Sequence, residues 1–275
     1  MSLEDSSIGF IGAGNMANAL IRGLLARGIA PEHLMAADID SDKLQKLKED
    51  CGIQAANSKE IASIADVVVL SVKPQVIKAA CQQIRPALEE RSCLIVSVAA
   101  GITCQHLQSW LGTQLALVRC MPNTPALVGK GATALYANAN VSAAQKQLAE
   151  ALLAAVGLAL WLDEETDIDA VTALSGSGPA NFFLLMEAMQ DVALEMGLDA
   201  DTARQLTYQT ALGAAELASN SSASTAELRR QVTSPGGTTE QALNQFEEGG
   251  LRTLVDKALK AAQRRSRELA RDFGD

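Results

Sequence analysis

"SIGFIGAGNMANALIRGLLARG", residues 7–28, is the stretch that most clearly indicates how this chain folds. An apolar run typical of a buried strand ends in a Gly12-x-Gly14-x-x-Ala17 turn, and an amphipathic helical pattern follows the turn. Gly12 permits the tight turn, Gly14 allows the backbone to approach a pyrophosphate, and Ala17 lets the helix pack on the strand. In this strand-to-helix context the turn predicts dinucleotide binding, with the phosphates at the positive end of the helix.

The first half of the chain continues this alternation of strands and helices. Several short runs are continuously apolar, as expected of strands buried on both faces of a mostly parallel sheet. The helical patterns at residues 15–28 and 41–52 each close with a glycine suited to a helix C-terminus. The predicted strands are "SIGFI", "LMAAD", "VVVLSV", "CLIVSV", "LALVRC", "ATALYA" and "LALWL". This rhythm predicts an α/β fold with a doubly wound (Rossmann) sheet and a dinucleotide-binding domain over residues 1–162.

Residues 163–275 have a different pattern, because strand runs cease and apolar residues recur at helical spacing. These helical stretches are apolar on more faces than one small domain can bury. Burial against a second copy of the chain is the simplest remedy. We therefore expect an all-helical C-terminal dimerisation domain, and a homodimer or larger homo-oligomer.

The amino-acid composition argues against several classes of function. Of the 275 residues 48% are hydrophobic, which is enough for a large core, whereas aromatics are 3% and the net charge is −9. Both values argue against a nucleic-acid partner. Five cysteines without a C-x-x-C pair indicate reduced thiols and no metal site. The polar start "MSLEDSS" is no signal peptide, and the longest apolar run is too short to span a membrane. We expect a cytoplasmic protein.

The choice of dinucleotide depends on the end of the second predicted strand. Asp38 lies there, where an acid bonds the ribose hydroxyls of NAD and would repel a 2′-phosphate. A helix cap is the alternative role for Asp38, although Asp40 and Ser41 also fit it. The sequence therefore favours NADH over NADPH.

Two further loops follow predicted strands at the edge where ligands of open α/β sheets bind. "SVKPQ" supplies residues 71–74 after the third strand, and "RCMPNTPALVGKG" places Asn123 between two prolines after the fifth. Proline stiffens a loop that must keep its shape. Together the two loops predict a wall of the cofactor pocket.

"VTSPGGTTEQAL", residues 232–243, predicts a second ligand site. The segment contains no cation, but Gly236 and Gly237 leave backbone N–H groups uncovered where a helix begins. These amides, the helix dipole and nearby hydroxyls are suited to a small carboxylate. The alternative is a plain N-cap at Thr238 or Thr239, with a glutamate in the first turn. That alternative does not require Ser-Pro-Gly-Gly before the threonines.

Five motifs in sequence order make the chain similar to the pyrroline-5-carboxylate reductases, enzymes that make proline. They are "FIGAGNMANAL", "VKPQ", "MPNTPALVGKG", "ALSGSGPANFF" and "LRRQVTSPGGTTEQAL", and the resemblance covers nearly the whole chain. It implies a Rossmann domain, a helical domain that forms an interlocked dimer, and often a ring of dimers. It also implies reduction of 1-pyrroline-5-carboxylate to L-proline by NAD(P)H, the last step of proline biosynthesis.

The resemblance also implies roles for particular residues. Thr239 lies near the ring nitrogen of the substrate, and we expect its hydroxyl, or water, to be the hydrogen-bond partner there. The residues expected to bind the substrate carboxylate are Ser234, Gly236, Gly237, Thr238 and Thr239. Those expected to bind the cofactor are Gly12, Ala13, Gly14, Asn15, Met16, Ala17, Asp38, Asn57, Ser71, Val72, Lys73, Pro74, Ala100, Gly101 and Asn123.

The chain departs from the family pattern at two places. Many members have Asn-Arg-Ser where this chain has Asp-Ile-Asp at residues 38–40, which again favours NADH. Asn181 stands where many members have an aromatic residue. His33 and His106 are isolated, and we expect both at the surface or in loops rather than in catalysis.

Two other functions fit the same architecture. A β-hydroxyacid dehydrogenase needs a lysine as acid and base on the first long helix of its second domain. This chain has no lysine between Lys146 and Lys257, which weakens that alternative. A non-catalytic dinucleotide-binding redox sensor could keep both ligand sites, and only turnover distinguishes it from an enzyme.

Overall fold

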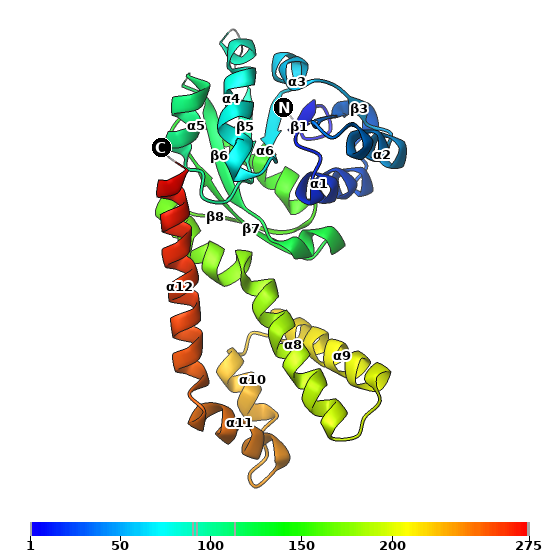
Figure 1. Cartoon of the computed structure of the whole chain (residues 1–275), viewed down its shortest axis with the longest axis vertical. Helices are drawn as coiled ribbons and strands as arrows, with labels where there is room; N and C mark the ends of the chain where they lie inside the picture. The colour runs from blue at the N-terminus through cyan, green and yellow to red at the C-terminus, as the bar shows by residue number, and fades with distance from the viewer. Residues whose placement is uncertain (1, 90, 92, 113, 274–275) are drawn as a thin grey trace. The chain divides into compact units, whose positions relative to one another are not determined.

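The computed structural model describes residues 2–89, 91, 93–112 and 114–273 (Figure 1). By its internal contacts the chain divides into two compact units. The first unit comprises Met1–Ser177 together with Ala261–Asp275, and the second comprises Gly178–Lys260.

One sheet of eight strands forms the centre of the first unit, in the order β3-β2-β1-β4-β5-β6-β7-β8. The strands are β1 (Ile8–Ile11), β2 (Leu34–Ala37), β3 (Gln54–Ala55), β4 (Val67–Leu70), β5 (Leu94–Ser97), β6 (Ala116–Met121), β7 (Gly131–Ala137) and β8 (Gly157–Trp161). All neighbours pair in parallel except β6 and β7. The predicted doubly wound sheet is confirmed, and each predicted strand is present. The strand β3 was not predicted, because it has two exposed residues and no apolar run.

Helices bury both faces of this sheet. Its strands alternate their side chains between two apolar clusters, so Ile8 and Phe10 face one cluster and Ile11 faces the other. The helices α1 (Asn15–Ala26), α2 (Ser41–Cys51) and α6 (Ala143–Ala154) contribute to the first cluster, and α3 (Ser58–Ile64), α4 (Pro74–Leu88) and α5 (Cys104–Leu111) to the second. Burial on two sides explains why these strands read as continuous apolar runs.

The sheet reverses its direction of winding at β1. This strand pairs with β2 on one side and with β4 on the other, so the chain leaves it in both directions across the sheet. The loops that follow these three strands therefore meet at one edge. In open α/β sheets this switch point is where ligands bind.

In the described part of the chain no strand follows β8 and all the regular elements after it are helical, as predicted. Short turns precede the long helices: η3 (Glu165–Asp167), α7 (Ile168–Val171) and a π-helical turn, η4 (Thr172–Gly176). The helices are α8 (Gly178–Glu195), α9 (Ala200–Ser219), α10 (Thr225–Gln231), α11 (Thr238–Glu248) and α12 (Leu251–Asp272). None of the helices in the described part of the chain is both long and apolar enough to cross a membrane.

The compact units do not divide where the secondary structure changes. Strands end at Trp161, but the first unit continues to Ser177 and takes in the last turns of α12. Contacts within that unit explain the difference, since Ser266 on α12 donates a hydrogen bond of 2.6 Å to Asp169 on α7. A functional boundary at residue 162 stays a prediction.

The second unit has almost no core of its own. All of its residues are described, and only Gly178, Ala203 and Thr207 are buried. Large apolar side chains lie open instead, including Phe182 and Phe183 on α8, which are 64% and 62% exposed. Such a unit cannot obtain its stability from internal apolar burial alone.

A buried ion pair joins β6 to the segment that follows the sheet. Arg119 Nη1 lies 3.0 Å from Glu165 Oε1, and the two side chains are 5% and 23% exposed. The same oxygen accepts a hydrogen bond of 2.8 Å from the backbone N–H of Cys104 at the start of α5. Glu165 thus holds three segments together.

Removing the carboxylate of Glu165 should destabilise the fold strongly. Glu165→Ala leaves the Arg119 guanidinium buried and unpaired, which we expect to lower the free energy of unfolding by about 3 kcal/mol. Replacing both residues by Met should recover much of this loss, because no buried charge is then left unpaired. Urea unfolding at fixed protein concentration measures both variants. A single variant as stable as the parent chain would contradict the assigned pairing.

Candidate functional site

The turn after β1 has the geometry of a phosphate-binding loop. Gly12 has φ +102°, and a Cβ atom on it would lie 2.7 Å from the backbone oxygen of Ser71, so only glycine fits. Gly14 is the N-cap of α1 without a side-chain cap, and apart from its immediate chain neighbours no residue comes within 4 Å of the position of its missing Cβ. The N–H groups of residues 15–17 have no partner among the described residues. Open amides beside open space fit a pyrophosphate.

Asp38 is fixed against this turn. Its Oδ2 accepts a hydrogen bond of 2.6 Å from Ala13 N–H, and its Oδ1 accepts one of 2.9 Å from Asp40 N–H. The N-cap of α2 is Asp40, which accepts from Lys43 N–H, so Asp38 does not cap the helix. The carboxylate therefore serves the glycine turn and lies where the second strand ends.

The loop after β4 is tied to the same turn. Ser71 Oγ donates to the carbonyl oxygen of Gly12 at 2.8 Å, and Ser71 N–H donates to Ile11. Val72 is half-buried, Lys73 is the exposed N-cap of α4, and Pro74 is the first residue of that helix. The structure thus brings the first glycine turn, Asp38 and the 71–74 loop together at one edge of the sheet.

The remaining predicted cofactor residues make contacts inside the protein. Asn57 caps α3 by accepting from Glu60 N–H at 2.9 Å. Asn123 accepts from Ala132 N–H at 2.9 Å and donates to Ser175 in the π-helical turn. Gly101 follows Ala100 after β5, is buried and has φ +76°; a Cβ there would lie 3.1 Å from a ring carbon of Phe273. A cofactor contact at these residues stays a prediction.

Neither cysteine nor histidine supplies a reactive group beside the turn. All five cysteines are free and buried, and burial raises the pKa of Cys81 and Cys104 to about 12. His106 does not lie in a loop, and its side chain is half-buried. His106 is part of α5, where it forms a capping box with Thr103 and stacks on Trp110. Partial burial, and then the charge of Arg119, lower the pKa of His106.

The predicted carboxylate site lies at the start of α11, in the second unit. The N-cap is Gly237, without a side-chain cap, so the alternative of an N-cap at Thr238 or Thr239 is wrong. Gly236 has φ +71°, and Gly237 N–H donates to Ser234 at 3.0 Å. In the described part of the chain the N–H groups of residues 238–240 form no hydrogen bond. The helix therefore begins with open amides, as the sequence predicts.

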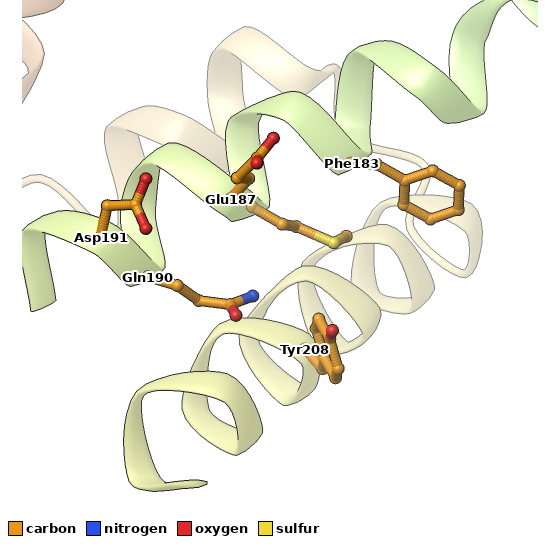
Figure 2. A pocket seen from close by; sticks show the side chains of 6 residues that line it. Phe183, Glu187, Gln190, Asp191 and Tyr208 are labelled. Carbon is orange, nitrogen blue, oxygen red and sulfur yellow. The ribbon is translucent and has the colours of Figure 1, made fainter. Parts of the chain in front are cut away.

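A hollow of about 370 Å³ lies between α8 and α9 of the same unit. Figure 2 shows Phe183 and the carboxylates of Glu187 and Asp191 on α8, with Tyr208 on α9. None of the predicted substrate or cofactor residues lines it. The hollow is separate from the start of α11.

Comparison with known proteins assigns the chain to a family. Residues 165–269 match the family model described as pyrroline-5-carboxylate reductase dimerisation, and residues 7–101 match the model described as NADP oxidoreductase coenzyme F420-dependent. The pyrroline-5-carboxylate reductase of Pseudomonas aeruginosa is 56% identical over 268 residues, which are 97% of this chain and 98% of that protein. The chain belongs to the pyrroline-5-carboxylate reductase family.

Solved structures of pyrroline-5-carboxylate reductases have the same fold. One from Coxiella burnetii has a TM-score of 0.92 and 47% identity, and covers 96% of this chain and 98% of its own. One from Plasmodium falciparum, with NADP bound, has a TM-score of 0.86 and 29% identity, and covers 97% and 99%. The family is one of NAD(P)-dependent oxidoreductases, so the cofactor is a nicotinamide dinucleotide.

Sequence reasoning missed two charged residues, Arg119 and Glu165, and described a third, Glu240, only in part. The sequence could have predicted a buried ion pair at Arg119, because an arginine inside the apolar run "LALVRC" needs a buried partner. It could not have predicted that the partner is Glu165, since the two residues are 46 positions apart. Glu240 was read only as a favourable acid in the first turn, whereas its carboxylate accepts a hydrogen bond from Gly236 N–H at 2.8 Å.

The two glycines of the turn should respond differently to the same substitution. Gly12→Ala places a methyl group against Ser71 in a left-handed conformation, and we expect it to cost about 2 kcal/mol of unfolding free energy. Gly14→Ala has an ordinary φ of −73° and open space, so its stability should change by less than about 0.5 kcal/mol. Thermal unfolding compares the pair. Equal losses would contradict the close approach assigned to Gly12.

Proposed function

We propose that this chain reduces 1-pyrroline-5-carboxylate to L-proline, the last step of proline biosynthesis, with NADH or NADPH as hydride donor. The observation that carries the proposal is 56% identity to a pyrroline-5-carboxylate reductase across 97% of the chain. The chain has backbone amides suited to the phosphates of the cofactor and to the carboxylate of the substrate. Open amides follow a glycine turn at the start of α1, and a second set lies at the start of α11.

The substrate carboxylate binds at the start of α11. The N–H groups of Thr238 and Thr239 form no hydrogen bond among the described residues, and Ser234, shortly before them in the chain, is exposed. Gly236 and Gly237 keep the approach free of side chains. A partial positive charge at a helix N-terminus replaces the cation that residues 232–243 lack.

The reduction asks little further chemistry of the protein. A nicotinamide bound at the first unit supplies the hydride, and the ring carbon of a protonated imine is already electrophilic. The Thr239 hydroxyl is the hydrogen-bond partner of the ring nitrogen and orients the ring. Positioning the imine is the main contribution of the chain, because a fixed geometry removes much of the entropic barrier.

The cofactor binds along the edge where β1, β2 and β4 end. The turn at residues 12–17 holds the pyrophosphate, and Asp38 faces the ribose and favours NADH. Residues 71–74, together with Asn57, Ala100, Gly101 and Asn123, line the rest of the cofactor site. In this proposal residues 1–162 bind the dinucleotide and residues 163–275 bind the substrate and dimerise.

The working form is a homodimer or a larger homo-oligomer in the cytoplasm. A unit in which Gly178, Ala203 and Thr207 are the buried residues needs a partner surface, and residues 165–269 match a dimerisation family model. A second copy of the chain supplies that surface.

The alternative functions have less support. A β-hydroxyacid dehydrogenase needs a lysine on its first long second-domain helix, and α8 contains none. A non-catalytic redox sensor would bind both ligands without turnover.

Turnover is the deciding measurement. Purified protein, 1-pyrroline-5-carboxylate and either NADH or NADPH are mixed, and oxidation of the cofactor is followed by its absorbance. We expect oxidation that depends on the imine. No oxidation above background with either cofactor would overturn the enzyme and leave the sensor.

Removing the charge of Asp38 should relax the preference for NADH. Asp38→Asn keeps an oxygen that accepts from Ala13 N–H and loses the acceptor of Asp40 N–H, while repulsion of a 2′-phosphate is also lost. We expect kcat/KM for NADPH relative to NADH to rise roughly tenfold, a change of about 1.4 kcal/mol. Asp42→Asn removes an exposed charge on α2 and is the control. An unchanged cofactor ratio would refute the role of Asp38.

Thr239 should matter for reduction and not for cofactor affinity. Thr239→Ala removes the hydroxyl next to the ring nitrogen, and we expect kcat to fall about tenfold or more, as for one lost hydrogen bond. The Kd for NADH should stay within about twofold. Thr239→Ser should restore most of the rate. If rate and NADH affinity fall together, Thr239 lies elsewhere in the working enzyme.

A further inference from the structure

The turn before α11 carries a carboxylate of its own. Glu240 Oε2 accepts a hydrogen bond of 2.8 Å from Gly236 N–H, four residues back along the chain. Gly237 N–H donates to the carbonyl oxygen of Ser234 at 3.0 Å. These two bonds take the amides of both glycines. The open amides are those of residues 238–240, so the first turn of α11 offers its donors in one direction.

The hydrogen bond from Gly236 N–H to Glu240 restrains a segment that contains two adjacent glycines. Gly236 has φ +71°, a region that glycine enters freely, and two adjacent glycines lose much conformational entropy when they are ordered. Glu240 is half-buried and extends from the third residue of α11 to this turn. It therefore presets the approach to the open amides before a ligand arrives.

The same carboxylate leaves a negative charge beside an anion site. No ion pair to Glu240 is present among the described residues. The arginines at the end of α10 do not neutralise it: Arg229 pairs with Glu247 at 3.6 Å, and Arg230 has no ion pair with Glu240. Glu247 is also held by Arg252 at 2.7 Å. The charge of Glu240 thus acts on whatever binds to the neighbouring amides.

We propose that Glu240 makes this site selective for zwitterionic ring acids over simple anions. The inference rests on the proposed function. A protonated cyclic imino acid and the cyclic amino acid formed from it each carry a carboxylate and a positive ring nitrogen, so their net charge is zero. A ring carboxylate without nitrogen keeps only its negative charge. Helix dipole and amides attract the carboxylate of both classes, whereas Glu240 opposes only the net anion.

Three substitutions separate the bond of Glu240 from its charge. Glu240→Gln keeps an oxygen that accepts from Gly236 N–H and removes the charge. Glu240→Asp keeps the charge on a side chain that is one methylene too short to reach that N–H. Glu240→Ala removes both. Glu248→Gln is the matched control, because it removes a charge from the far end of the same helix, where Glu248 contacts Gln245.

L-proline and cyclopentanecarboxylate are the probes. They share ring size and carboxylate and differ in the ring nitrogen, and both are measured as inhibitors of 1-pyrroline-5-carboxylate reduction by the full-length protein. For Glu240→Gln we expect Ki for cyclopentanecarboxylate to fall roughly 3- to 10-fold, as for one partly screened charge, and Ki for L-proline to change less than about twofold. Glu240→Asp should keep the parent ratio of the two Ki values.

The hydrogen bond between Gly236 N–H and Glu240 is tested separately, through KM for 1-pyrroline-5-carboxylate. Glu240→Asp and Glu240→Ala should raise KM for 1-pyrroline-5-carboxylate roughly 3- to 10-fold, whereas Glu240→Gln should not, and KM for NADH should stay within about twofold in all three. Glu248→Gln should change neither the Ki ratio nor KM. Circular dichroism and size measurement check folding, and the Asp and Ala pair decides the question if the Gln variant does not fold.

The role of Glu240 and the reduction of 1-pyrroline-5-carboxylate are tested by different outcomes. A parent protein that oxidises neither cofactor with the imine has a different function. A parent protein that turns over, with a Ki ratio that does not respond when the charge at residue 240 is removed by Gln or Ala, overturns the role of Glu240 alone.

Discussion

The proposed cofactor site is built on the close approach of two backbone segments at the switch point of the sheet. The turn after β1 passes so near the loop after β4 that a single added carbon on Gly12 would meet Ser71 at 2.7 Å. Side chains then lock this approach, because Ser71 donates to Gly12 and Asp38 accepts from Ala13. Three strand ends are thereby joined at one turn. The open amides of α1 have their position because this junction is rigid.

The second unit, in contrast, is not held together by internal packing. Its helices expose large apolar side chains, and almost nothing in it is buried, so its stability must come from a surface outside the unit. The start of α11 belongs to this unit. A site built on main-chain amides suits such a place, since its donors are set by the helix itself and need no deep pocket around them.

Both proposed ligand sites rely on helix N-termini that lack a side-chain cap. Gly14 precedes α1 and Gly237 precedes α11, and neither glycine offers a group that could take up the first amides. Several other helices have a side-chain cap, as at Asp40, Asn57 and Thr103, although α4 also begins without one, at Lys73. A helix start without a side-chain cap leaves its first amides open to an anion. Each site also has a carboxylate beside it, Asp38 at the first and Glu240 at the second.

Sequence patterns were enough to predict the doubly wound sheet, all of its strands except β3, the glycine turn and the helical second half. These features follow from local patterns, since a strand buried on both faces must be apolar throughout and a tight turn must contain glycine. Contacts between residues far apart in the chain could not be predicted in this way, because they depend on how the elements pack. Arg119 pairs with Glu165 from 46 positions away, and His106 lies partly buried in α5 instead of in a loop. The N-cap at Gly237 and the bond of Glu240 are local, yet several side chains in that stretch could have capped the helix. The backbone conformation determines which residue is the N-cap, because a capping hydrogen bond depends on backbone dihedral angles that residue types alone do not specify.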